Sequence, residues 1–447
     1  MSSNKKQNRK AWVVAVDMGY GHERAANPFS DIANEGIIIA NNYQGIPEED
    51  RRVWQSSRKF YEFVSRAKYL PLIGNIIFGV FDYFQRINPF YPRRDLSAKT
   101  MQLKYMYRLM RHSNWGKNLI EYLNKDPQIP FLATFFNVAF FAEYHGYKGD
   151  IYCIVTDTDI SRTWAPLEPH NSKIKYLAPT NRAVERLKLY GVKPQNIFLT
   201  GFPLPKDNIG GRQMTNLKSD LWDRIHQLDP THKFINKYHE SLNHYLGPVK
   251  KITKRPLTLT FAVGGAGAQR ELGANILKSL RKWIISGKIK INLIAGIRNE
   301  VYIYFKEAIN KLGLQKHLGE NIDIIFAINK NDYFDRFNQI LRVTDILWTK
   351  PSELAFFTAL GIPIVISDPI GSQEFYNQNW LTSLGGGINQ DNPKYADQWL
   401  SDWLESGWLA EAAFQGFLDA PKFGTYKIEE IIFNKSLTKT NGHVELL

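Results

Sequence analysis

LTLTFAV (residues 257–263), GGAGA (264–268) and QRELGANILKSLRKWI (269–284) follow one another directly, and this stretch decides the fold. The first piece is β-branched and apolar, as in a buried parallel strand, and the last has apolar residues at helical spacing. Small residues at the junction let the backbone approach a ligand, and the first amides of the helix then point at it. The pattern predicts a phosphate or pyrophosphate site at Gly264, Gly265 and Gly267. The alternative is a tight strand-to-helix turn without a ligand.

Strand-like runs alternate with helical runs along the chain, which predicts an α/β protein with two parallel sheets covered by helices on both faces. The expected strands are 12–17, 36–40, 129–136, 151–156, 174–178 and 197–200, then 257–263, 291–295, 322–327, 346–348 and 362–367. The predicted domains are residues 10–205, with a basic and aromatic insertion at about 41–128, and residues 257–435. The polar stretch 206–256 between them is expected to form a helical insertion and linker.

Composition limits the class of protein. A chain of 447 residues with 44% hydrophobic and 22% charged residues is long enough and apolar enough for two folded domains. Its one cysteine, Cys153, excludes a disulfide framework and favours a reducing cytoplasm. The polar, basic start MSSNKKQNRK does not resemble a signal peptide. No apolar stretch reaches the roughly 18 to 20 residues of a membrane span.

The net charge of +14 is concentrated in one segment, because residues 51–117 hold fourteen Lys or Arg against three acidic residues. Within it, FYEFVSRAKYLPLIGNIIFGVFDYFQRINPFYPRR (60–94) is an apolar run between basic flanks, as in a segment lying in a membrane interface. Phe78, Phe81 and Arg86 are the expected membrane contacts. The alternative is a helical insertion packed on the first domain. Nucleic acid is not an expected partner, because the central run is apolar rather than a charged groove.

A second small-residue turn, DMGYGH (17–22), follows the first strand. It places His22 at the carboxyl end of the sheet, where open α/β sheets bind ligands and where a near-neutral pKa suits a general base. Asp157 and Asp159 follow another buried strand and point into the same crevice, where they can orient a hydroxyl or a base. The alternative for Asp159 is a cap or turn former.

Two further segments carry polar groups in the second half. In TKPSE (349–353), Pro351 presets a helix, Ser352 can cap it, and Glu353 either accepts hydrogen bonds from ribose or favours the helix N-terminus. In GSQEFYN (371–377), amide and carboxylate side chains are suited to reading sugar hydroxyls. Ordinary surface polarity is the alternative for that loop. The residues concerned are Gln373, Glu374 and Asn377.

These pieces, in this order, resemble the two-domain GT-B glycosyltransferases of the family 28 type, which include the monogalactosyldiacylglycerol synthases. The resemblance rests on DMGYGHERAA (17–26), TDTDISRTWAP (156–166), AVGGAGAQREL (262–272) and IGSQEFYN (370–377). It implies two Rossmann-like domains that face each other across a cleft. Ser161 and the KPSEL stretch (350–354) depart from the family pattern, so the chain resembles a divergent branch.

The resemblance also implies roles for individual residues. His22 would be the base, with Asp17 or Asp157 assisting, and Gly21 and Trp164 would lie at the acceptor. The glycines of 264–267 would face the donor diphosphate. The remaining donor contacts would be Arg298, Glu353, Gln373, Glu374 and Asn377. No metal is expected in the chemistry.

The function implied is that of an inverting hexosyltransferase. It would move a sugar from a nucleotide diphosphate, a UDP-sugar, to a lipid or lipid-linked acceptor, without a cofactor. It would act as a cytoplasmic protein held peripherally on the inner face of an anionic membrane. Two alternatives stay open: a nucleotide-sugar epimerase or hydrolase on the same fold, and a non-catalytic membrane-associated protein.

Overall fold

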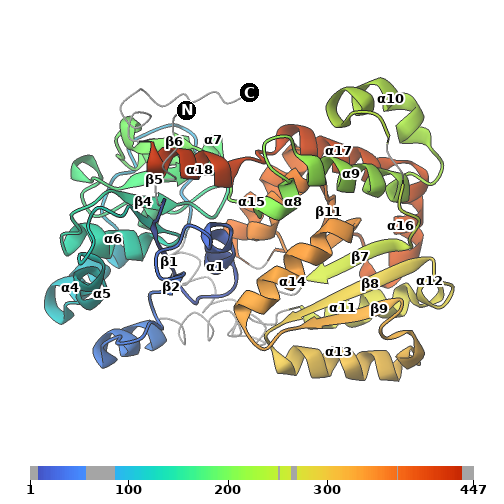
Figure 1. The fold of residues 1–447 in the computed structure, drawn as a ribbon, viewed down its shortest axis with the longest axis horizontal. Coiled ribbons are helices and arrows are strands. Elements are labelled where there is room, and N and C mark those ends of the chain that lie inside the picture. Colours follow the sequence, from blue (N-terminus) through green and yellow to red (C-terminus); the bar gives the residue numbers. More distant parts are fainter. Residues whose placement is uncertain (1–8, 57–85, 250–251, 263–268, 370, 435–447) are drawn as a thin grey trace, which may run out of the picture. The chain divides into compact units, whose positions relative to one another are not determined.

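The computed structural model describes residues 9–56, 86–249, 252–262, 269–369 and 371–434. The chain forms two compact units, and each contains one parallel six-stranded sheet (Figure 1). Unit 1 comprises residues 1–203, 371–373 and 423–447, and unit 2 comprises residues 204–370 and 374–422. The predicted fold class, two Rossmann-like α/β domains, is confirmed.

The sheet of unit 1 has the strand order β2-β1-β3-β4-β5-β6. Alternate residues of its strands pack into two separate cores: Val14, Ala133 and Cys153 enter one, whereas Val13, Leu132 and Ile154 enter the other. A strand buried on both faces must be apolar throughout, which is why these runs read as continuous hydrophobic stretches. The strands are β1 (Trp12–Ala15), β2 (Ile38–Ile39), β3 (Phe131–Ala133), β4 (Ile151–Ile154), β5 (Lys175–Ala178) and β6 (Ile197–Leu199).

Helices cover both faces of this sheet. The first core includes α4 (Met101–Ser113), α5 (Lys117–Leu123), α6 (Phe136–Tyr144) and α7 (Asn181–Leu189). The second core is closed by the last helix, α18 (Gly424–Phe433), whose Ile428, Ile431 and Ile432 pack there (Figure 1). The described part of the predicted insertion, which contains α4 and α5, therefore packs on unit 1.

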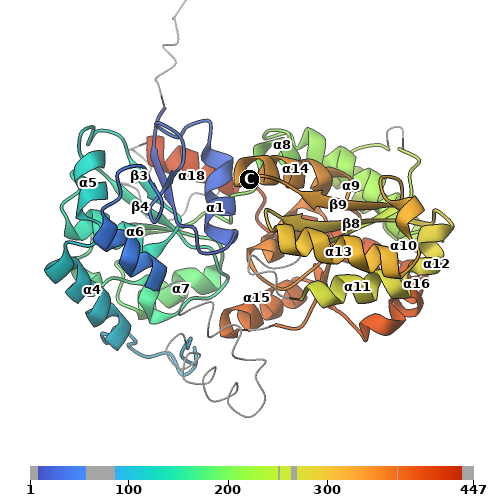
Figure 2. The ribbon, with the colours of Figure 1, turned by 90° about the horizontal axis from the view of Figure 1, so that it is seen from below.

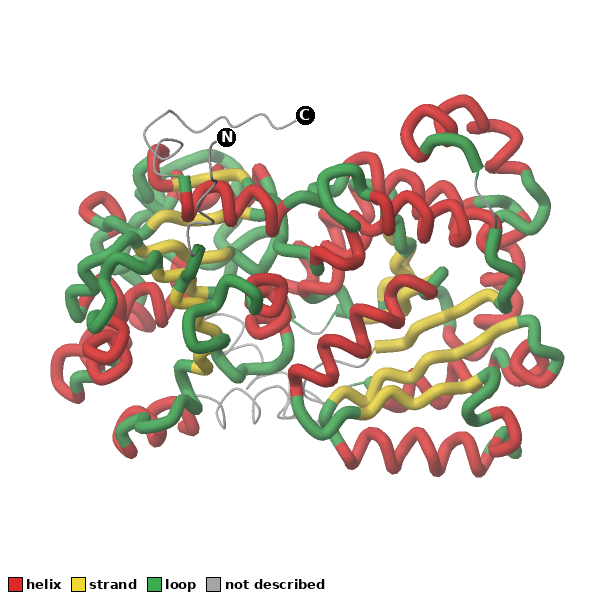
Figure 3. The backbone as a smooth tube through the Cα atoms, in the orientation of Figure 1, coloured by secondary structure: helices red, strands yellow, loops and turns green. Residues whose placement is uncertain are grey.

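The sheet of unit 2 has the order β12-β11-β10-β7-β8-β9, and its strands lie side by side in Figure 3. Its strands are β7 (Leu257–Ala262), β8 (Ile289–Gly296), β9 (Ile322–Phe326), β10 (Ile346–Thr349), β11 (Ile364–Ile366) and β12 (Gly387–Asn389). All eleven predicted strands are present, each shifted by one to three residues at one or both ends. The weakly apolar β12 was not predicted.

Helices α11 (Arg270–Ser279) and α13 (Asn299–Lys311) lie side by side on one face of this sheet, and α14 (Lys330–Val343) lies on the other (Figures 1 and 2). Gly273 makes the close approach of α11 possible. A Cβ at this position would lie 2.7 Å from Phe305 of α13 and 2.9 Å from Phe261 of β7.

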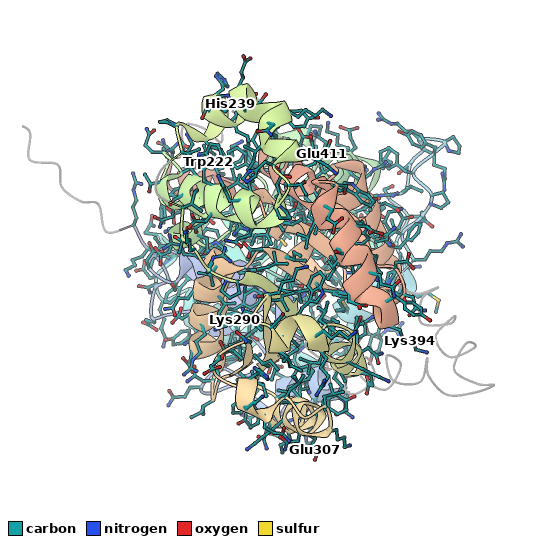
Figure 4. All side chains as sticks on the ribbon, turned by 90° about the vertical axis from the view of Figure 1, so that its right-hand side faces the viewer. Trp222, His239, Lys290, Glu307, Lys394 and Glu411 are labelled. Carbon is teal, nitrogen blue, oxygen red and sulfur yellow. The ribbon has the colours of Figure 1, made fainter. Side chains whose placement is uncertain are left out.

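The stretch 206–256 belongs to unit 2 rather than standing apart. It forms α8 (Lys206–Ile209), α9 (Thr215–Leu228) and α10 (Lys233–Leu246). Trp222 of α9 and Glu411 of α17 (Trp408–Asp419) label two neighbouring helices in Figure 4. The linker is fixed by Arg255, whose two terminal nitrogens lie 2.5 and 2.7 Å from the carboxylate oxygens of buried Asp345.

Arg224 anchors α9 most firmly. Its buried guanidinium donates hydrogen bonds to the carbonyls of Leu341, Thr344, Leu360 and Gly361 at distances of 2.6 to 3.2 Å. These carbonyls lie at the C-terminal ends of α14 and of the 3-10 helix η6 (Glu353–Leu360). A cation at a helix C-terminus satisfies the last carbonyls and complements the helix dipole. One side chain from α9 thus caps the ends of two helices of unit 2.

The described units differ from the predicted domain limits at the C-terminal end. The prediction assigned residues up to 435 to the second domain, whereas α18 belongs to unit 1. Its apolar face packs on the sheet of unit 1, a partner that lies more than two hundred residues away along the chain. Within the described residues, none of the helices has an apolar stretch long enough to cross a membrane.

Candidate functional site

The first candidate site lies at the carboxyl edge of the unit 1 sheet, where the strand order reverses. Strand β1 is flanked by β2 on one side and by β3 on the other, so the loops after β1 and β3 diverge at this point. Open α/β sheets bind ligands at such a switch point. The loop after β1 carries Asp17, Gly21 and His22, and the loop after β3 begins at Thr134.

The turn after β1 is held from β2. The side chain of Asn41 accepts from the backbone N–H of Asp17 at 2.8 Å and donates to its carbonyl at 3.0 Å. This pair of bonds fixes the backbone, and the half-buried Asp17 carboxylate stays at the sheet edge. Helix α1 (Gly21–Ala26) then begins at Gly21, which puts His22 in its first turn.

His22 is held in one tautomer. Its Nδ1 lies 2.8 Å from the carbonyl oxygen of Thr134, and a carbonyl only accepts hydrogen bonds. The proton of the neutral imidazole is therefore on Nδ1, and the lone pair is on Nε2. A histidine oriented by a backbone carbonyl in this way is suited to act as a base through its second nitrogen.

Aromatic rings surround this histidine. The ring of Phe135 lies 4.6 Å from that of His22, and Phe136 lies 4.3 Å from Phe135 and 5.2 Å from Trp164 between ring centroids. Phe135 and Phe136 are half-buried and Trp164 is buried. The predicted Trp164 is thus connected to the predicted base through the rings of Phe135 and Phe136. The two phenylalanines were not predicted as site residues, because they were assigned to the end of the predicted strand 129–136, whereas β3 ends at Ala133.

The two carboxylates of the TDTD segment differ in their surroundings. Asp159 is buried and forms two 2.8 Å hydrogen bonds with the buried Arg186, so it holds the loop to α7. Asp159 therefore has a structural role, but as the partner of a buried ion pair rather than as the predicted cap or turn former. Asp157 is half-buried and comes directly after β4, so it is the carboxylate that a ligand can reach.

The membrane contacts predicted from the sequence lie mostly outside the described residues. This holds for Phe78 and Phe81, whereas Arg86 is described and exposed. The exposed face of the nearby α4 carries Met101 and Tyr105, 75% and 59% exposed, together with Lys104, Arg108 and Arg111. Helix α4 contains no acidic residue. An apolar and aromatic face with several cations is typical of a helix at an anionic interface.

The second candidate site lies at the switch point of unit 2, between β7 and β10. The predicted phosphate loop with Gly264, Gly265 and Gly267 is outside the described residues. The description resumes at Gln269, which has a left-handed backbone (φ 67°). Its side chain accepts from Ser367 Oγ at 2.9 Å and donates to the carbonyl of Asp368 at 3.0 Å. The end of the loop is thereby tied to the end of β11.

Glu374 forms an ion pair with Lys350, and both side chains are largely buried. The pair brings together the end of β10 and the first turn of α15 (Ser372–Ser383). Lys350 was not predicted as a site residue, because its partner lies 24 positions away. Gln373 is half-buried in the same turn, and Asn377 is fully buried one turn further on.

The predicted helix entry at 351–353 is wrong in two respects. Residues 353–360 form a 3-10 helix, and the side chain of Ser352 does not cap it. The backbone N–H of Ser352 donates to the carbonyl of Lys350 at 2.8 Å. Seven of these eight residues are buried, so tertiary packing rather than capping determines the geometry. Glu353 is half-buried at the start of this helix.

Arg298 follows β8 and directly precedes α13, and its guanidinium lies 3.2 Å from Glu300. The backbone N–H of Glu300 itself and this arginine lower the pKa of the Glu300 carboxyl. At the end of the neighbouring β9, Phe326 stacks 5.3 Å from Tyr302, and Ile328 is 91% exposed. Among the described residues, no three His, Cys, Asp or Glu side chains come together as a metal site.

The chain thus has two Rossmann-like domains, and each has polar side chains at its switch point. The GT-B class has the same two domains. A family model described as "Domain of unknown function (DUF6938)" matches residues 249–427. The chain is 21% identical over 392 residues to the processive diacylglycerol beta-glucosyltransferase of Bacillus subtilis (strain 168), covering 85% of this chain and 83% of that protein. The Staphylococcus carnosus protein of the same name is 21% identical over 429 residues, covering 94% and 92%.

A crystal structure of Acinetobacter baumannii MurG is also similar, with a TM-score of 0.43 and 14% identity, covering 73% of this chain and 78% of that one. The sequence relatives confirm the resemblance to GT-B glycosyltransferases that the motifs predicted.

Proposed function

We propose that this chain is a glycosyltransferase that moves a hexose from a nucleotide diphosphate to the hydroxyl of a lipid acceptor at a membrane surface. The observation that carries the proposal is His22, which Thr134 fixes with Nε2 as its basic atom and which contacts Phe135, the first ring of a cluster with Phe136 and Trp164. A base within an aromatic wall suits a hydroxyl carried by an apolar molecule. The relatives named diacylglycerol glucosyltransferases support the same class of acceptor.

The proposed chemistry is a single displacement with inversion. Nε2 of His22 takes the proton of the acceptor hydroxyl, and the oxygen forms a bond to the anomeric carbon of the donor sugar. The bond between that carbon and the diphosphate oxygen breaks, and the nucleotide diphosphate leaves with the electron pair. Asp17 and Asp157 are the carboxylates proposed to stabilise the imidazolium that forms.

The donor side of the proposal belongs to unit 2, except that Gln373 is counted in unit 1. The leaving diphosphate is assigned to the backbone around Gly264, Gly265 and Gly267, and Arg298 adds positive charge. Glu353 is assigned to the ribose, and Gln373, Glu374 and Asn377 to the sugar hydroxyls. The ion pair with Lys350 holds the Glu374 carboxylate in one orientation, and a fixed carboxylate is a strong acceptor for sugar hydroxyls. A UDP-sugar is the proposed donor, with no further cofactor.

The acceptor requires access to a membrane. The exposed face of α4, with Lys104, Tyr105, Arg108 and Arg111, supports peripheral binding to anionic lipid on the cytoplasmic face. Lys and Arg side chains near an anionic surface each contribute about 1 kcal/mol to such binding.

The test is a two-stage measurement on the full chain. A panel of nucleotide diphosphates and their sugars is first screened for an increase in melting temperature, because a ligand that binds only the folded state stabilises it. The stabilising sugar nucleotide is then incubated with vesicles that contain diacylglycerol. Formation of glycosylated lipid supports the proposal. An altered or free sugar without acceptor would instead indicate an epimerase or hydrolase, and no stabilisation by any nucleotide would indicate a non-catalytic protein.

A further inference from the structure

Two buried polar atoms in the segment that contacts His22 have no hydrogen-bond partner among the described residues. They are the hydroxyl Oγ1 of Thr134 and the amide Oδ1 of Asn137. Thr134 is fully buried and Asn137 is 8% exposed. Both belong to the short segment that runs from the end of β3 into the first turn of α6.

An unpaired buried polar atom is costly, and most such atoms in folded proteins have a partner. Two of them within four residues, at the switch point of a sheet, call for a ligand that supplies the missing bonds. The segment is also the one that orients the proposed base, since the carbonyl of Thr134 receives Nδ1 of His22. Phe135 is the N-cap residue of α6, and its side chain makes no hydrogen bond to the backbone N–H groups at the start of this helix.

The chemistry of the two atoms restricts the ligand. An amide oxygen only accepts hydrogen bonds, so its partner must be a donor, whereas a threonine hydroxyl both donates and accepts. An anionic phosphate or carboxylate offers only acceptors and would face Asn137 Oδ1 unfavourably. A neutral hydroxyl satisfies both atoms. The adjoining rings of Phe135 and Phe136 are half-buried and suit the apolar body that carries such a hydroxyl.

We propose that Thr134 and Asn137 bind the hydroxyl-bearing headgroup of the acceptor lipid and thereby position its reacting oxygen at Nε2 of His22. The inference rests on the proposed transfer reaction and names the residues that select the acceptor. Thr134 then has two functions through two atoms: its carbonyl orients the base, and its hydroxyl binds the substrate that the base deprotonates.

The test uses Thr134→Val and Asn137→Leu, which remove the polar atoms and nearly keep the volume. Each is expected to raise the acceptor KM about three- to tenfold, the loss of one hydrogen bond. The melting shift caused by the nucleotide should stay the same. The melting temperature without ligand should stay unchanged or rise, because an unpaired buried polar group has been removed. This combination separates a binding role from a structural one.

Thr200→Val is the matched control. Thr200 is also a buried threonine after a strand of the same sheet, but its hydroxyl donates to the carbonyl of Gly201 at 2.8 Å. Its removal should lower the melting temperature and leave the acceptor KM unchanged. An acceptor KM within twofold of the wild type in both Thr134→Val and Asn137→Leu would overturn the inference.

A second experiment measures binding to lipid vesicles and therefore does not depend on sugar transfer. Wild-type protein is sedimented with vesicles that contain diacylglycerol, which has a free hydroxyl, or triacylglycerol, which has none. A preference for diacylglycerol that both variants lose supports the inference even if no sugar is transferred. The absence of transfer by the wild type counts against the proposed function alone. The absence of any hydroxyl preference in the wild type overturns the inference.

Discussion

Nδ1 of His22 lies 2.8 Å from the carbonyl oxygen of Thr134, and this contact joins the loops after β1 and β3 where the strand order reverses. The imidazole is therefore oriented by backbone before any ligand arrives. Because the bond uses a main-chain atom, no substitution at position 134 removes the acceptor itself, so the role of His22 is best tested at His22.

His22→Ala should lower kcat by about 10²- to 10⁴-fold, the usual contribution of a general base. Nucleotide binding should persist, because His22 is not among the residues assigned to the donor. The readouts are the rate of sugar transfer and the nucleotide-dependent melting shift. His145→Ala is the control, since the Nε2 of that half-buried histidine lies 2.8 Å from the carbonyl of Trp115. Normal turnover in His22→Ala would remove the proposed base.

Glu374→Gln should weaken binding of the nucleotide sugar more than binding of the nucleotide diphosphate alone. The substitution removes the charge that Lys350 balances and weakens the acceptor assigned to the sugar hydroxyls. We expect an increase of about tenfold in the Kd for the sugar nucleotide, measured by titration calorimetry. Asp323→Asn is the control, because Lys290 and Asp323 form a 2.7 Å pair whose side chains are about one-third exposed. Equal losses for both ligands would mean that Glu374 does not contact the sugar.

Arg224→Met should lower the free energy of unfolding by about 3–5 kcal/mol, since buried carbonyls at the ends of two helices lose their donor. Urea denaturation followed by circular dichroism measures this change. Arg281→Met is the matched control. Its Nε donates to the carbonyl of Leu312 at the end of α13, but at the surface, where water replaces it, so a loss below about 1 kcal/mol is expected. Similar losses in the two variants would contradict the anchoring role of Arg224.

The triple variant Lys104→Gln, Arg108→Gln and Arg111→Gln should reduce binding to anionic vesicles about 100-fold at low salt, at about 1 kcal/mol per charge. The effect should shrink at high salt, because salt screens exposed charges. Vesicle sedimentation measures the partitioning.

A control for the α4 surface removes three exposed lysines from unit 2, Lys278, Lys282 and Lys306. This variant has the same net charge as the α4 variant, so it separates a local surface from a general charge effect. Equal binding of the two variants would argue against α4 as the membrane contact.

Lys422→Met should stabilise the protein at pH 7 but not at high pH. Burial lowers the pKa of Lys422 to about 8, and its Nζ lies 4.7 Å from the ring centre of Phe417. The unfolded chain binds this proton more tightly, so the charged lysine destabilises the fold fully below pH 8, and this cost disappears as the pH approaches about 10.5.

The expected gain for Lys422→Met is about 1–3 kcal/mol at pH 7, measured by urea denaturation at pH 7 and at pH 10. Lys394→Met is the control at an exposed lysine, labelled in Figure 4. A gain that is independent of pH would mean that packing, rather than desolvation of the ammonium, explains the effect.

Local pattern was enough to predict most of the fold. Continuous apolar runs predicted β4 (Ile151–Ile154) and β7 (Leu257–Ala262) because both faces of each sheet are buried, and the small-residue turn after β1 was recognisable without a structure. The same local reasoning located His22, Asp157 and Trp164 at one sheet edge. The short β12 was not predicted, because its sequence GIN carries almost no strand signal.

What the sequence did not predict depends on partners far away along the chain. The Lys350–Glu374 pair, the carbonyls that Arg224 caps and the placement of α18 all join segments that no local pattern relates. Asp159 illustrates the same limit, because its ion-pair partner Arg186 lies 27 positions later in the chain. Residue type indicates what a side chain can do, and only the tertiary partner decides whether it does so.

The membership of α18 in unit 1 has a consequence for how this chain is made. On the ribosome, the strands of unit 1 emerge first, but the side of the sheet with Leu132, Leu177 and Phe198 is completed by Ile428, Ile431 and Ile432 of α18, which join Phe29 and Ile32 in this core. All of unit 2 must be synthesised in between. During translation this apolar face of unit 1 therefore stays partly exposed. Chaperones are expected to bind it until α18 leaves the ribosomal exit tunnel.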